Sequence, residues 1–453
     1  MLVFVLALVF AACGDGRNDD EESSGDDDDT EQTTDDTVDD GEEPAEGSDL
    51  IDATDCPGDP TTGVADGTIK LGTSLPQSGL YASFAEILRG SQAYFSYVNE
   101  ELGGVTVNGE QYQIELVAED DAYDAEQTVG NVTGLVNDDQ VFGLFNVVGT
   151  KNNLAVREFV NENCAPSLFA ATGAPAWGNH EYPWVLGTFL VPYPLEMQAL
   201  VDYLNETTPD ASIAILAAND DFGAAYVETL ESLVEGTGLT IAATETYDTA
   251  TGEVASQITT LAATDADVFL LGATLTACPT VLNELAGSGW DPIVYMSGTC
   301  TSKTLMGLAG QNGDGVISVA PLLDPADPAN ASNEAMTLYN EKVAQYQPEA
   351  AADNGIVAYG WSAAAMLVYT LENSPELTRE SVMETARSLT DVSDVGLMLP
   401  GATWSVGADD WFLGEQFNLV QYSAADGFFS AVGDLKVYDD QTEEVTPESL
   451  VNG

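Results

Sequence analysis

Two consecutive runs of alternating strand-like and helical segments constrain the fold of this chain most strongly. The strand-like segments of the first run are 69–74, 112–118, 142–145 and 167–169, and its helical patterns are 86–102, 126–137 and 153–162. The second run has strand-like segments at 213–217, 240–246, 268–272 and 293–296, with helical patterns such as 224–235 and 279–286. Each run is typical of a parallel sheet covered by helices. The sequence therefore predicts an α/β protein with two parallel-sheet lobes.

The remaining segments complete these lobes. A strand-like segment at 316–321 leads to helical patterns at 333–346 and 355–372, and strand-like 417–422 is followed by a hairpin return to residue 437. The run 356–371 is apolar enough to suggest a membrane span. It is short and contains several tyrosine, tryptophan and serine residues, so we predict a buried core helix.

Two loops of the first run have the composition of a ligand site. Residues 146–152 connect a strand to a helix, and within them Gly149 allows close backbone approach and Thr150 offers a hydroxyl. Free N–H groups at the start of the next helix favour a carboxylate. The small residues 170–172 follow the neighbouring strand, and both loops lie at the carboxyl ends of their strands, where ligands bind. Ordinary capped α/β loops would have the same composition.

The amino terminus has the pattern of an export signal. Met1 to Ala12 is apolar and is too short to span a bilayer. Phe10, Ala11 and Ala12 precede Cys13 and resemble a lipobox, which implies that Cys13 is acylated; a plain cleaved signal is the alternative. Residues 13–66 are rich in Asp, Glu, Ser, Thr and Gly, and we predict that they form a disordered acidic linker.

The charge balance excludes one class of partner. Ten basic residues face 76 acidic ones, which leaves a formal net charge of -66. Nucleic acid binding requires Lys and Arg clusters that this chain lacks. The acidity is typical of a surface adapted to salty surroundings, where repulsion is screened over roughly 10 Å.

Five phrases of the sequence together carry a family resemblance. They are SGLYASFAEILRGSQAYFSYVN (78–99), EDDAYDAEQ (119–127), LFAATGAPAWG (168–178), ANDDFGAAY (218–226) and AGSGWDP (286–292). In this order and spacing, the chain from about residue 69 to beyond 429 resembles the leucine/isoleucine/valine-binding family of ABC-transporter substrate-binding proteins. The resemblance implies a type I periplasmic-binding fold, with two Rossmann-like lobes that close on a ligand by hinge motion.

The resemblance also implies domain boundaries. We expect the first lobe at 67–190 plus 321–400, the second at 191–320 plus 401–440, and a C-terminal tail at 441–453. Three crossings near 187–192, 320–322 and 399–404 would join the lobes.

The family's pocket can be carried over position by position. Its predicted residues here are Phe84, Asn146, Gly149, Thr150, Ala170, Ala171, Thr172, Phe222, Thr274 and Thr299. Gly149 and Thr150 would hold a carboxylate, and Phe84 and Phe222 would be aromatic lids. The acidic residue that pairs with the ammonium of an amino acid falls near Thr299, where SGTCTSK contains no Asp or Glu. A buried ammonium without a partner is costly, so the ligand need not be a free α-amino acid; a small carboxylate, amide or other neutral molecule fits as well.

The role implied by the resemblance is non-enzymatic. We expect a monomeric, lipid-anchored protein outside the cytoplasm that delivers a small ligand to an ABC permease; a ligand sensor of the same fold is the alternative. The only histidine, His180, lies in the loop WGNHEYPW without a catalytic set, and no nucleotide motif occurs. Asp120 and Asp121 match structural or rim positions of the family. No cofactor or metal is expected.

Four cysteines other than Cys13 are expected to pair, because exported chains favour disulfides. Cys278 and Cys300 each follow one of two consecutive parallel strands, so we pair them with each other and Cys56 with Cys164. Four cysteines allow three pairings, and buried free thiols are the alternative. Zinc is not expected, since there is no CxxC spacing.

Overall fold

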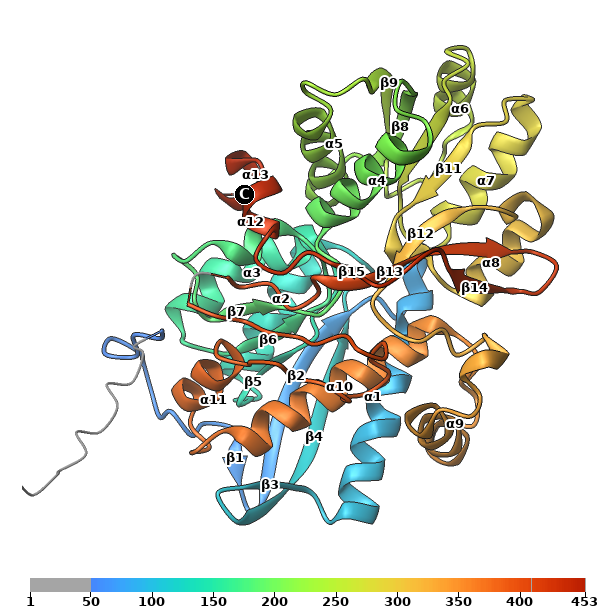
Figure 1. Ribbon diagram of the computed structural model, residues 1–453. Helices are drawn as coiled ribbons and strands as arrows, with labels where there is room; N and C mark the ends of the chain where they lie inside the picture. The colour runs from blue at the N-terminus through green and yellow to red at the C-terminus, as the bar shows by residue number, and fades with distance from the viewer. Residues whose placement is uncertain (1–49, 409, 453) are drawn as a thin grey trace, which may run out of the picture. The chain divides into compact units, whose positions relative to one another are not determined.

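The computed structural model describes residues 50–408 and 410–452, which form two sheets covered by helices (Figure 1). The first sheet has the order β3-β4-β2-β5-β6-β7, with β1 paired to β2. Its strands are β1 (Val64–Ala65), β2 (Thr68–Leu75), β3 (Val105–Val107), β4 (Glu110–Asp120), β5 (Gly143–Phe145), β6 (Ser167–Ala170) and β7 (Val185–Gly187). Strands β2 and β4 to β7 are parallel, and the short β1 and β3 are antiparallel to their partners.

Helices from two separate parts of the chain cover this first sheet. They are α1 (Ala85–Tyr97), α2 (Ala125–Asn137), α3 (Thr150–Glu162), α9 (Glu334–Tyr346), α10 (Gly355–Asn373) and α11 (Arg379–Ala386). The closest pair is α1 and α10, because a Cβ at Gly90 or Gly360 would collide with the backbone of the other helix. Nearly all of α10 is buried, as predicted for the apolar run 356–371. None of the helices within the described residues is long and apolar enough to cross a membrane.

The second sheet has the order β14-β13-β12-β11-β10-β8-β9, with β15 paired to β13. Its strands are β8 (Ser212–Ala218), β9 (Thr240–Tyr247), β10 (Val268–Gly272), β11 (Ile293–Met296), β12 (Ile317–Ala320), β13 (Gln416–Ser423), β14 (Phe428–Ala431) and β15 (Lys436–Val437). Strands β8 to β12 are parallel, and β13 to β15 form an antiparallel edge. The helices that follow its parallel strands or precede them are α4 (Tyr193–Thr207), α5 (Asp221–Leu233), α6 (Ala255–Ala262), α7 (Ala277–Ser288) and α8 (Lys303–Ala309).

The chain changes sheet three times. It leaves the first sheet after β7, returns to the helices of the first sheet after β12, and reaches the second sheet again at β13. The two short helices at the C-terminus, α12 (Thr442–Val445) and α13 (Glu448–Asn452), pack on the turn η3 (Pro175–Gly178). This architecture is the α/β fold with two mixed, mostly parallel sheets that the sequence predicts.

The predicted acidic linker is wrong for residues 50–66. Ile51 is only 2 % exposed, Cys56 is bonded to Cys164, and Pro60 accepts a hydrogen bond from the Arg379 backbone N–H. This segment is rich in turn residues rather than core residues, and it is held by a disulfide and backbone hydrogen bonds instead of by a large apolar area. The predicted signal, Cys13 and the linker before residue 50 lie outside the described residues.

Both predicted disulfides are present. The Cα atoms of Cys56 and Cys164 lie 5.6 Å apart, and those of Cys278 and Cys300 lie 6.3 Å apart. The first bond attaches segment 50–66 to Cys164, just after the end of α3, and the second joins the first turn of α7, which follows β10, to the short helical turn that follows β11.

Candidate functional site

A cavity of about 120 Å³ lies between loops of the two sheets. On the scale where one water molecule needs roughly 10–15 Å³, it suits a ligand with on the order of ten non-hydrogen atoms. The predicted residues that line it are Phe84, Gly149, Thr150, Ala171, Phe222, Thr274 and Thr299. The lining that was not predicted includes Ile87, Tyr123, Val148, Leu190, Tyr193, Leu322, Leu323, Asp324, Ile356, Tyr359 and Phe429.

The wall on the first lobe is formed by the start of α3 and the loop after β6. Helix α3 begins at Thr150, three residues earlier than predicted, so its first-turn N–H groups lack helical acceptors beside the cavity. Gly149 has φ of +100°, and a Cβ there would lie 2.7 Å from Cε2 of Tyr123. Only glycine therefore allows this close approach of the backbone.

Polar groups of this first wall bond to one another. The hydroxyl oxygens of Thr150 and Thr172 lie 2.7 Å apart, and the Ala171 N–H donates to the Val147 carbonyl at 2.8 Å. Tyr193, the first residue of α4, is buried beside them, and burial raises the pKa of its hydroxyl. The Thr150–Thr172 and Ala171–Val147 bonds use the Ala171 N–H and one of the two hydroxyl protons, so the donors left for an acceptor group of a ligand are the first-turn N–H groups of α3 and the other hydroxyl proton.

Asn146, Ala170 and Thr172 do not line the cavity, contrary to prediction. The amide Nδ2 of Asn146 donates to the Phe169 carbonyl and to the Tyr359 hydroxyl, both at 2.8 Å, so this side chain supports the wall from behind. The wall position belongs instead to Tyr359 of α10, whose hydroxyl donates to Thr188 Oγ1 at 3.1 Å. Only tertiary packing brings Tyr359 to Asn146, because the two residues are 213 positions apart.

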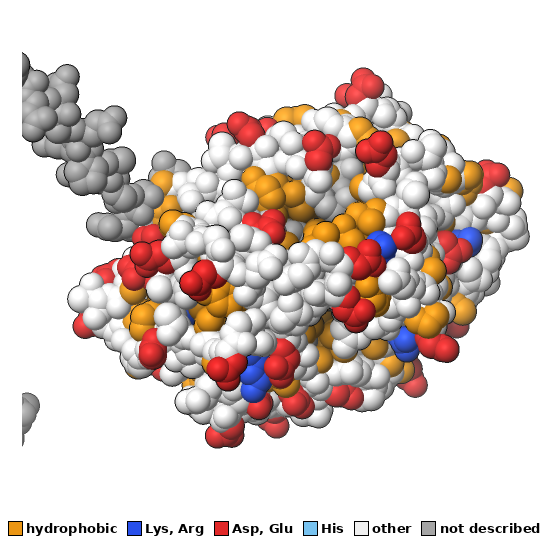
Figure 2. Space-filling view, turned by 90° about the horizontal axis from the view of Figure 1, so that it is seen from below, with side chains coloured by type: hydrophobic (Ala, Val, Ile, Leu, Met, Phe, Trp, Pro, Cys, Tyr) orange, Lys and Arg blue, Asp and Glu red, His pale blue; other side chains and the backbone are white. Residues whose placement is uncertain are grey.

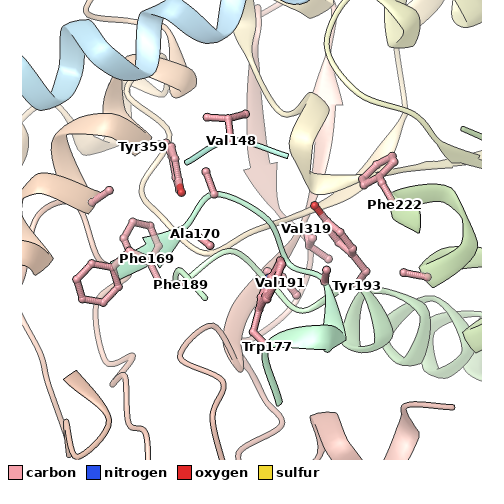
Figure 3. Packing of buried hydrophobic residues seen from close by; sticks show 14 of the residues in the cluster. Val148, Phe169, Ala170, Trp177, Phe189, Val191, Tyr193, Phe222, Val319 and Tyr359 are labelled. Carbon is pink, nitrogen blue, oxygen red and sulfur yellow. The ribbon is translucent and has the colours of Figure 1, made fainter. Parts of the chain in front are cut away.

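The wall on the second lobe is mainly aromatic and aliphatic. The ring of Phe222 meets that of Tyr193 edge-on, with centroids 5.0 Å apart, and Figure 3 shows the two side chains next to each other. The Thr299 hydroxyl is hydrogen-bonded within the protein: it lies 2.9 Å from Ser297 Oγ and donates to the Ala273 carbonyl at 3.2 Å. The hydroxyl of Thr274 is buried and has no partner among the described residues.

The charged groups around the cavity are few. Among the described residues that line the cavity, Asp324 is the one that is charged, and its oxygens accept the N–H groups of Ala326 and Phe429 at 2.8 and 3.0 Å. Burial raises the pKa of Asp324. On the face in Figure 2, acidic side chains are scattered over the surface with few Lys and Arg, and hydrophobic side chains gather around a hollow.

Three contacts join the lobes at one edge of the cavity. The Tyr81 hydroxyl donates to the Thr249 carbonyl at 3.1 Å, and the Thr276 hydroxyl donates to the Leu80 carbonyl at 3.2 Å. The ammonium of Lys151 lies 4.8 Å from the ring centre of Tyr123 and 3.5 Å from Thr249 Oγ1. Tyr81 precedes the predicted lid Phe84 in the turn Gly79–Phe84, so this turn covers the cavity.

The other side chains that the sequence suggested as reactive groups, His180 and Asp121, make contacts within the protein. His180 stacks on the ring of Trp411 with centroids 4.1 Å apart and does not line the cavity. Asp121 is buried and accepts hydrogen bonds from Ser74 Oγ and the Tyr123 N–H, which shapes the loop that carries Tyr123. Within the described residues, no group of three or more His, Cys, Asp or Glu side chains could hold a metal ion.

Tyr123 and Tyr193 could have been found from the sequence by their settings. Tyr123 lies in the phrase EDDAYDAEQ, and Tyr193 lies between two prolines at the predicted crossing. The lining residues after β12 and on α10 could not be found from the sequence, because their local pattern is the same as that of ordinary core residues.

Comparisons with known proteins agree with this arrangement. A family described as periplasmic binding protein matches residues 68–427. A leucine-, isoleucine-, valine-, threonine- and alanine-binding protein from Pseudomonas aeruginosa is 23 % identical over 334 residues, which covers 73 % of this chain and 84 % of the relative.

Two solved structures that share this fold are described with different ligands. A branched-chain amino acid ABC transporter protein from Thermus thermophilus with bound valine has a TM-score of 0.72 and 16 % identity, covering 83 % of this chain and 98 % of that one. A fatty acid ABC transporter substrate-binding protein from Thermomonospora curvata has a TM-score of 0.70 and 22 % identity, covering 85 % of this chain and 96 % of that one. The shared fold therefore does not determine the ligand.

Proposed function

The chain belongs to the periplasmic binding protein family, and we propose that it is the substrate-binding protein of an ABC importer. It would close its two lobes on one small ligand and deliver that ligand to the permease. Such a protein binds and releases its ligand unchanged, so no catalytic group is needed in the cleft.

The observation that carries this proposal is the cavity between the lobes and the unequal chemistry of its walls. Donor groups gather at Thr150 and the start of α3, while Tyr123, Phe222 and Phe429 supply apolar surface. Ligand pockets typically combine an apolar lining with a few placed polar groups. A small carboxylate, amide or amino-acid-like molecule with an apolar body matches this lining.

A thermal-shift experiment tests the ligand class. The purified protein is titrated with amino acids, amides and short carboxylates, and any molecule that copurifies is identified by mass spectrometry. A ligand present at about 100 times its Kd stabilises the closed state by about 2.7 kcal/mol, which raises the melting temperature by several degrees.

The double variant Thr150→Val, Phe222→Ala serves as the control, because it alters both walls of the cavity. We expect it to melt cooperatively and to lose the shift. A panel without any shift, or shifts of equal size in the double variant, would refute binding in this cavity.

We also propose that acylated Cys13 anchors the protein to the outer face of the cell membrane. The motif of Phe10, Ala11 and Ala12 before Cys13 supports this, as do the apolar residues before it. Phase separation in a cloud-point detergent measures anchoring. The wild type should partition into the detergent phase and Cys13→Ser into the aqueous phase; equal partitioning of both proteins would exclude a lipid on Cys13.

A further inference from the structure

We propose that the Asp324 carboxylate determines the specificity of the cavity by pairing with a cationic group of the ligand, such as an ammonium. The inference rests on the proposed function and specifies the ligand class of the same cavity. It places the carboxylate or other acceptor of the ligand on the first wall and the cation of the ligand at the crossing that follows β12.

Asp324 lies beside apolar side chains of the cavity. It follows β12 at the second crossing, and its neighbours in the lining include Leu322, Leu323, Pro325 and Phe429. Asp324 carries the one charge among the lining residues that the structure describes. A carboxylate in apolar surroundings loses hydration, and this loss is offset only by hydrogen bonds and a countercharge.

Two hydrogen bonds hold the Asp324 carboxylate in place and leave part of it free. One oxygen accepts the Ala326 N–H at 2.8 Å, and the other accepts the Phe429 N–H at 3.0 Å. An ionised carboxylate has about four acceptor positions, so each oxygen can accept a further hydrogen bond from a ligand. Because the backbone fixes this carboxylate before a ligand binds, less conformational entropy is lost on binding.

The protein supplies this carboxylate with little positive charge. None of the ion pairs among the described residues includes Asp324. The charge of Lys303 acts on Asp324, but the Lys303 ammonium lies 2.6 Å from a carboxylate oxygen of Asp353. Burial, together with the negative charge of Asp327, raises the pKa of Asp324 in spite of Lys303. A ligand cation would supply the missing countercharge.

Two other carboxyl groups lie close to the cavity without lining it. Beneath the second wall, Glu196 is only 2 % exposed and accepts the Gly298 N–H at 3.1 Å. Asp220 is the N-cap of α5 and accepts the Gly223 N–H at 3.3 Å. A cation in the cavity therefore meets the carboxylate of Asp324 rather than that of Glu196 or Asp220.

Groups of the opposite polarity lie at the start of α3. Its first-turn N–H groups lack helical acceptors, and Thr150, the first residue of the helix, lines the cavity. The cavity thus combines hydrogen-bond donors for a ligand oxygen with one carboxylate for a cation, and its volume suits on the order of ten non-hydrogen atoms. These features fit a small zwitterion, with the positive group either on the carbon next to its carboxylate or farther along its chain.

Isothermal titration calorimetry with two pairs of probes tests for the cation. L-Leucine and 4-methylpentanoate share one carbon skeleton, as do 5-aminopentanoate and pentanoate, and in each pair only the first compound carries an ammonium. We expect the ammonium compound of at least one pair to bind about tenfold more tightly than its partner. The pair that responds shows where on the skeleton the positive group belongs.

Two variants assign the contact to Asp324. Asp324→Asn removes the charge and keeps the size of the side chain, so the advantage of the ammonium compound should disappear. Asp327→Asn is the matched control, because it removes a nearby charge outside the lining and should retain the advantage. Thermal melting verifies that both variants are folded, and the probe pairs in the wild type keep the inference testable if Asp324→Asn does not fold.

Two results would overturn the inference while the proposed function stands: ammonium compounds that bind no more tightly than their partners in both pairs, or an advantage that is unchanged in Asp324→Asn. Binding of none of the four probes would refute a small-carboxylate ligand, and with it both the proposed ligand class and this inference.

Discussion

The first wall of the cleft is formed mainly by polar groups that bond to one another, whereas the second wall, among the described residues, is formed mainly by rings and by loop segments that a disulfide cross-links. On the first wall, backbone bonds tie the loop after β5 to the loop after β6, and Thr150 meets Thr172. On the second, the first turn of α7 after β10 is joined covalently to the turn after β11. The first wall is thus ordered by hydrogen bonds close to the main chain, and the second by a cross-link and by packing.

This difference separates affinity from selectivity. The N–H groups at the start of α3 and the hydroxyl groups can donate hydrogen bonds to any carboxylate or similar acceptor. The first wall therefore supports affinity for a broad class of ligands that carry such a group. The second wall is mainly aromatic and aliphatic, so the shape of its lining distinguishes among members of that class. Variants that disturb one wall and spare the other can test this division.

The largest expected effect comes from removing the disulfides one at a time. Cys56 and Cys164 are 108 residues apart, and Cys278 and Cys300 are 22 apart. The loop-entropy relation then predicts losses of about 5 kcal/mol for Cys56→Ala, Cys164→Ala and about 3 kcal/mol for Cys278→Ala, Cys300→Ala. Chemical denaturation under non-reducing conditions measures both values.

Ligand affinity should show the opposite order. We expect the Cys278, Cys300 double variant to lose roughly tenfold in affinity for a ligand identified by thermal shift, because Thr274 and Thr299 are no longer held together. The Cys56, Cys164 double variant should bind nearly as the wild type, since that bond lies outside the cavity lining. Equal affinities in the two variants would show that the cross-link does not position the second wall.

A pH effect should arise beneath the second wall. Burial raises the pKa of Glu196 from 4.5 to about 8, so the folded protein holds a proton that the unfolded chain releases between these pH values. The contribution of Glu196 to stability is therefore full below about pH 4.5 and falls as pH rises toward 8, by on the order of 3–5 kcal/mol.

Glu196→Gln should remove this loss, so that the variant gains stability over the wild type as pH rises from 5 to 8. Denaturation curves across this range measure the difference. Burial and the nearby Asp410 also raise the pKa of Glu415 to about 8, which makes Glu415→Gln a matched comparison at a second buried carboxyl. A stability difference between Glu196→Gln and wild type that does not vary with pH would contradict the assignment.

The first wall should be most sensitive at Gly149. Gly149→Ala combines a left-handed φ with a collision against Tyr123, and we expect a loss of about 2–3 kcal/mol together with at least tenfold weaker ligand binding. Gly109→Ala is the matched control, because Gly109 has φ of +81° in open space and should lose only about 1 kcal/mol. If the two variants lost equal stability, close backbone approach would not be the reason for glycine at position 149.

The smallest expected effect is at the contact between the lobes. Lys151→Met keeps the aliphatic stem but removes the charge above Tyr123, so we expect less than about 1 kcal/mol of lost stability. Because the charge of Lys151 acts near Asp220, this small loss should diminish further in high salt. Melting curves at low and high salt measure it, with Lys70→Met at an exposed ion pair as the control. A loss well above that of the control would make Lys151 a main contact between the lobes.

Much of the architecture was predictable because strand and helix patterns are local. The predicted strands of both sheets lie within two residues of the observed ones, and the buried helix α10 follows from its length and composition. The start of α3 was placed three residues late, because Thr150, Lys151 and Asn152 are polar and continue no apolar pattern. Segment 50–66 was misassigned for a similar reason, since a composition rich in turn residues does not reveal a disulfide and backbone bonds to distant elements.

The candidate site was predictable only in part. Gly149 and Thr150 were predicted because sheet geometry places the loops after parallel strands at one edge, and Thr274 and Thr299 were predicted from the family resemblance; all four lie in the cavity lining. Asn146 was predicted to bind the ligand because its local setting resembles that of Thr150, but it is outside the cavity lining, and its amide bonds to Tyr359 behind the wall.

The sequence by itself determined the fold class and the absence of acidic residues from the loops of the second wall, and it favoured the cysteine pairing that the structure shows. These properties depend on local periodicity, on strand order and on residue identity. Only the tertiary structure decided which atoms face the cavity, that the Thr299 hydroxyl is satisfied and that of Thr274 is not. The physical reason is that hydrogen-bond satisfaction depends on distances between atoms from separate elements, and no pattern along the chain specifies those distances.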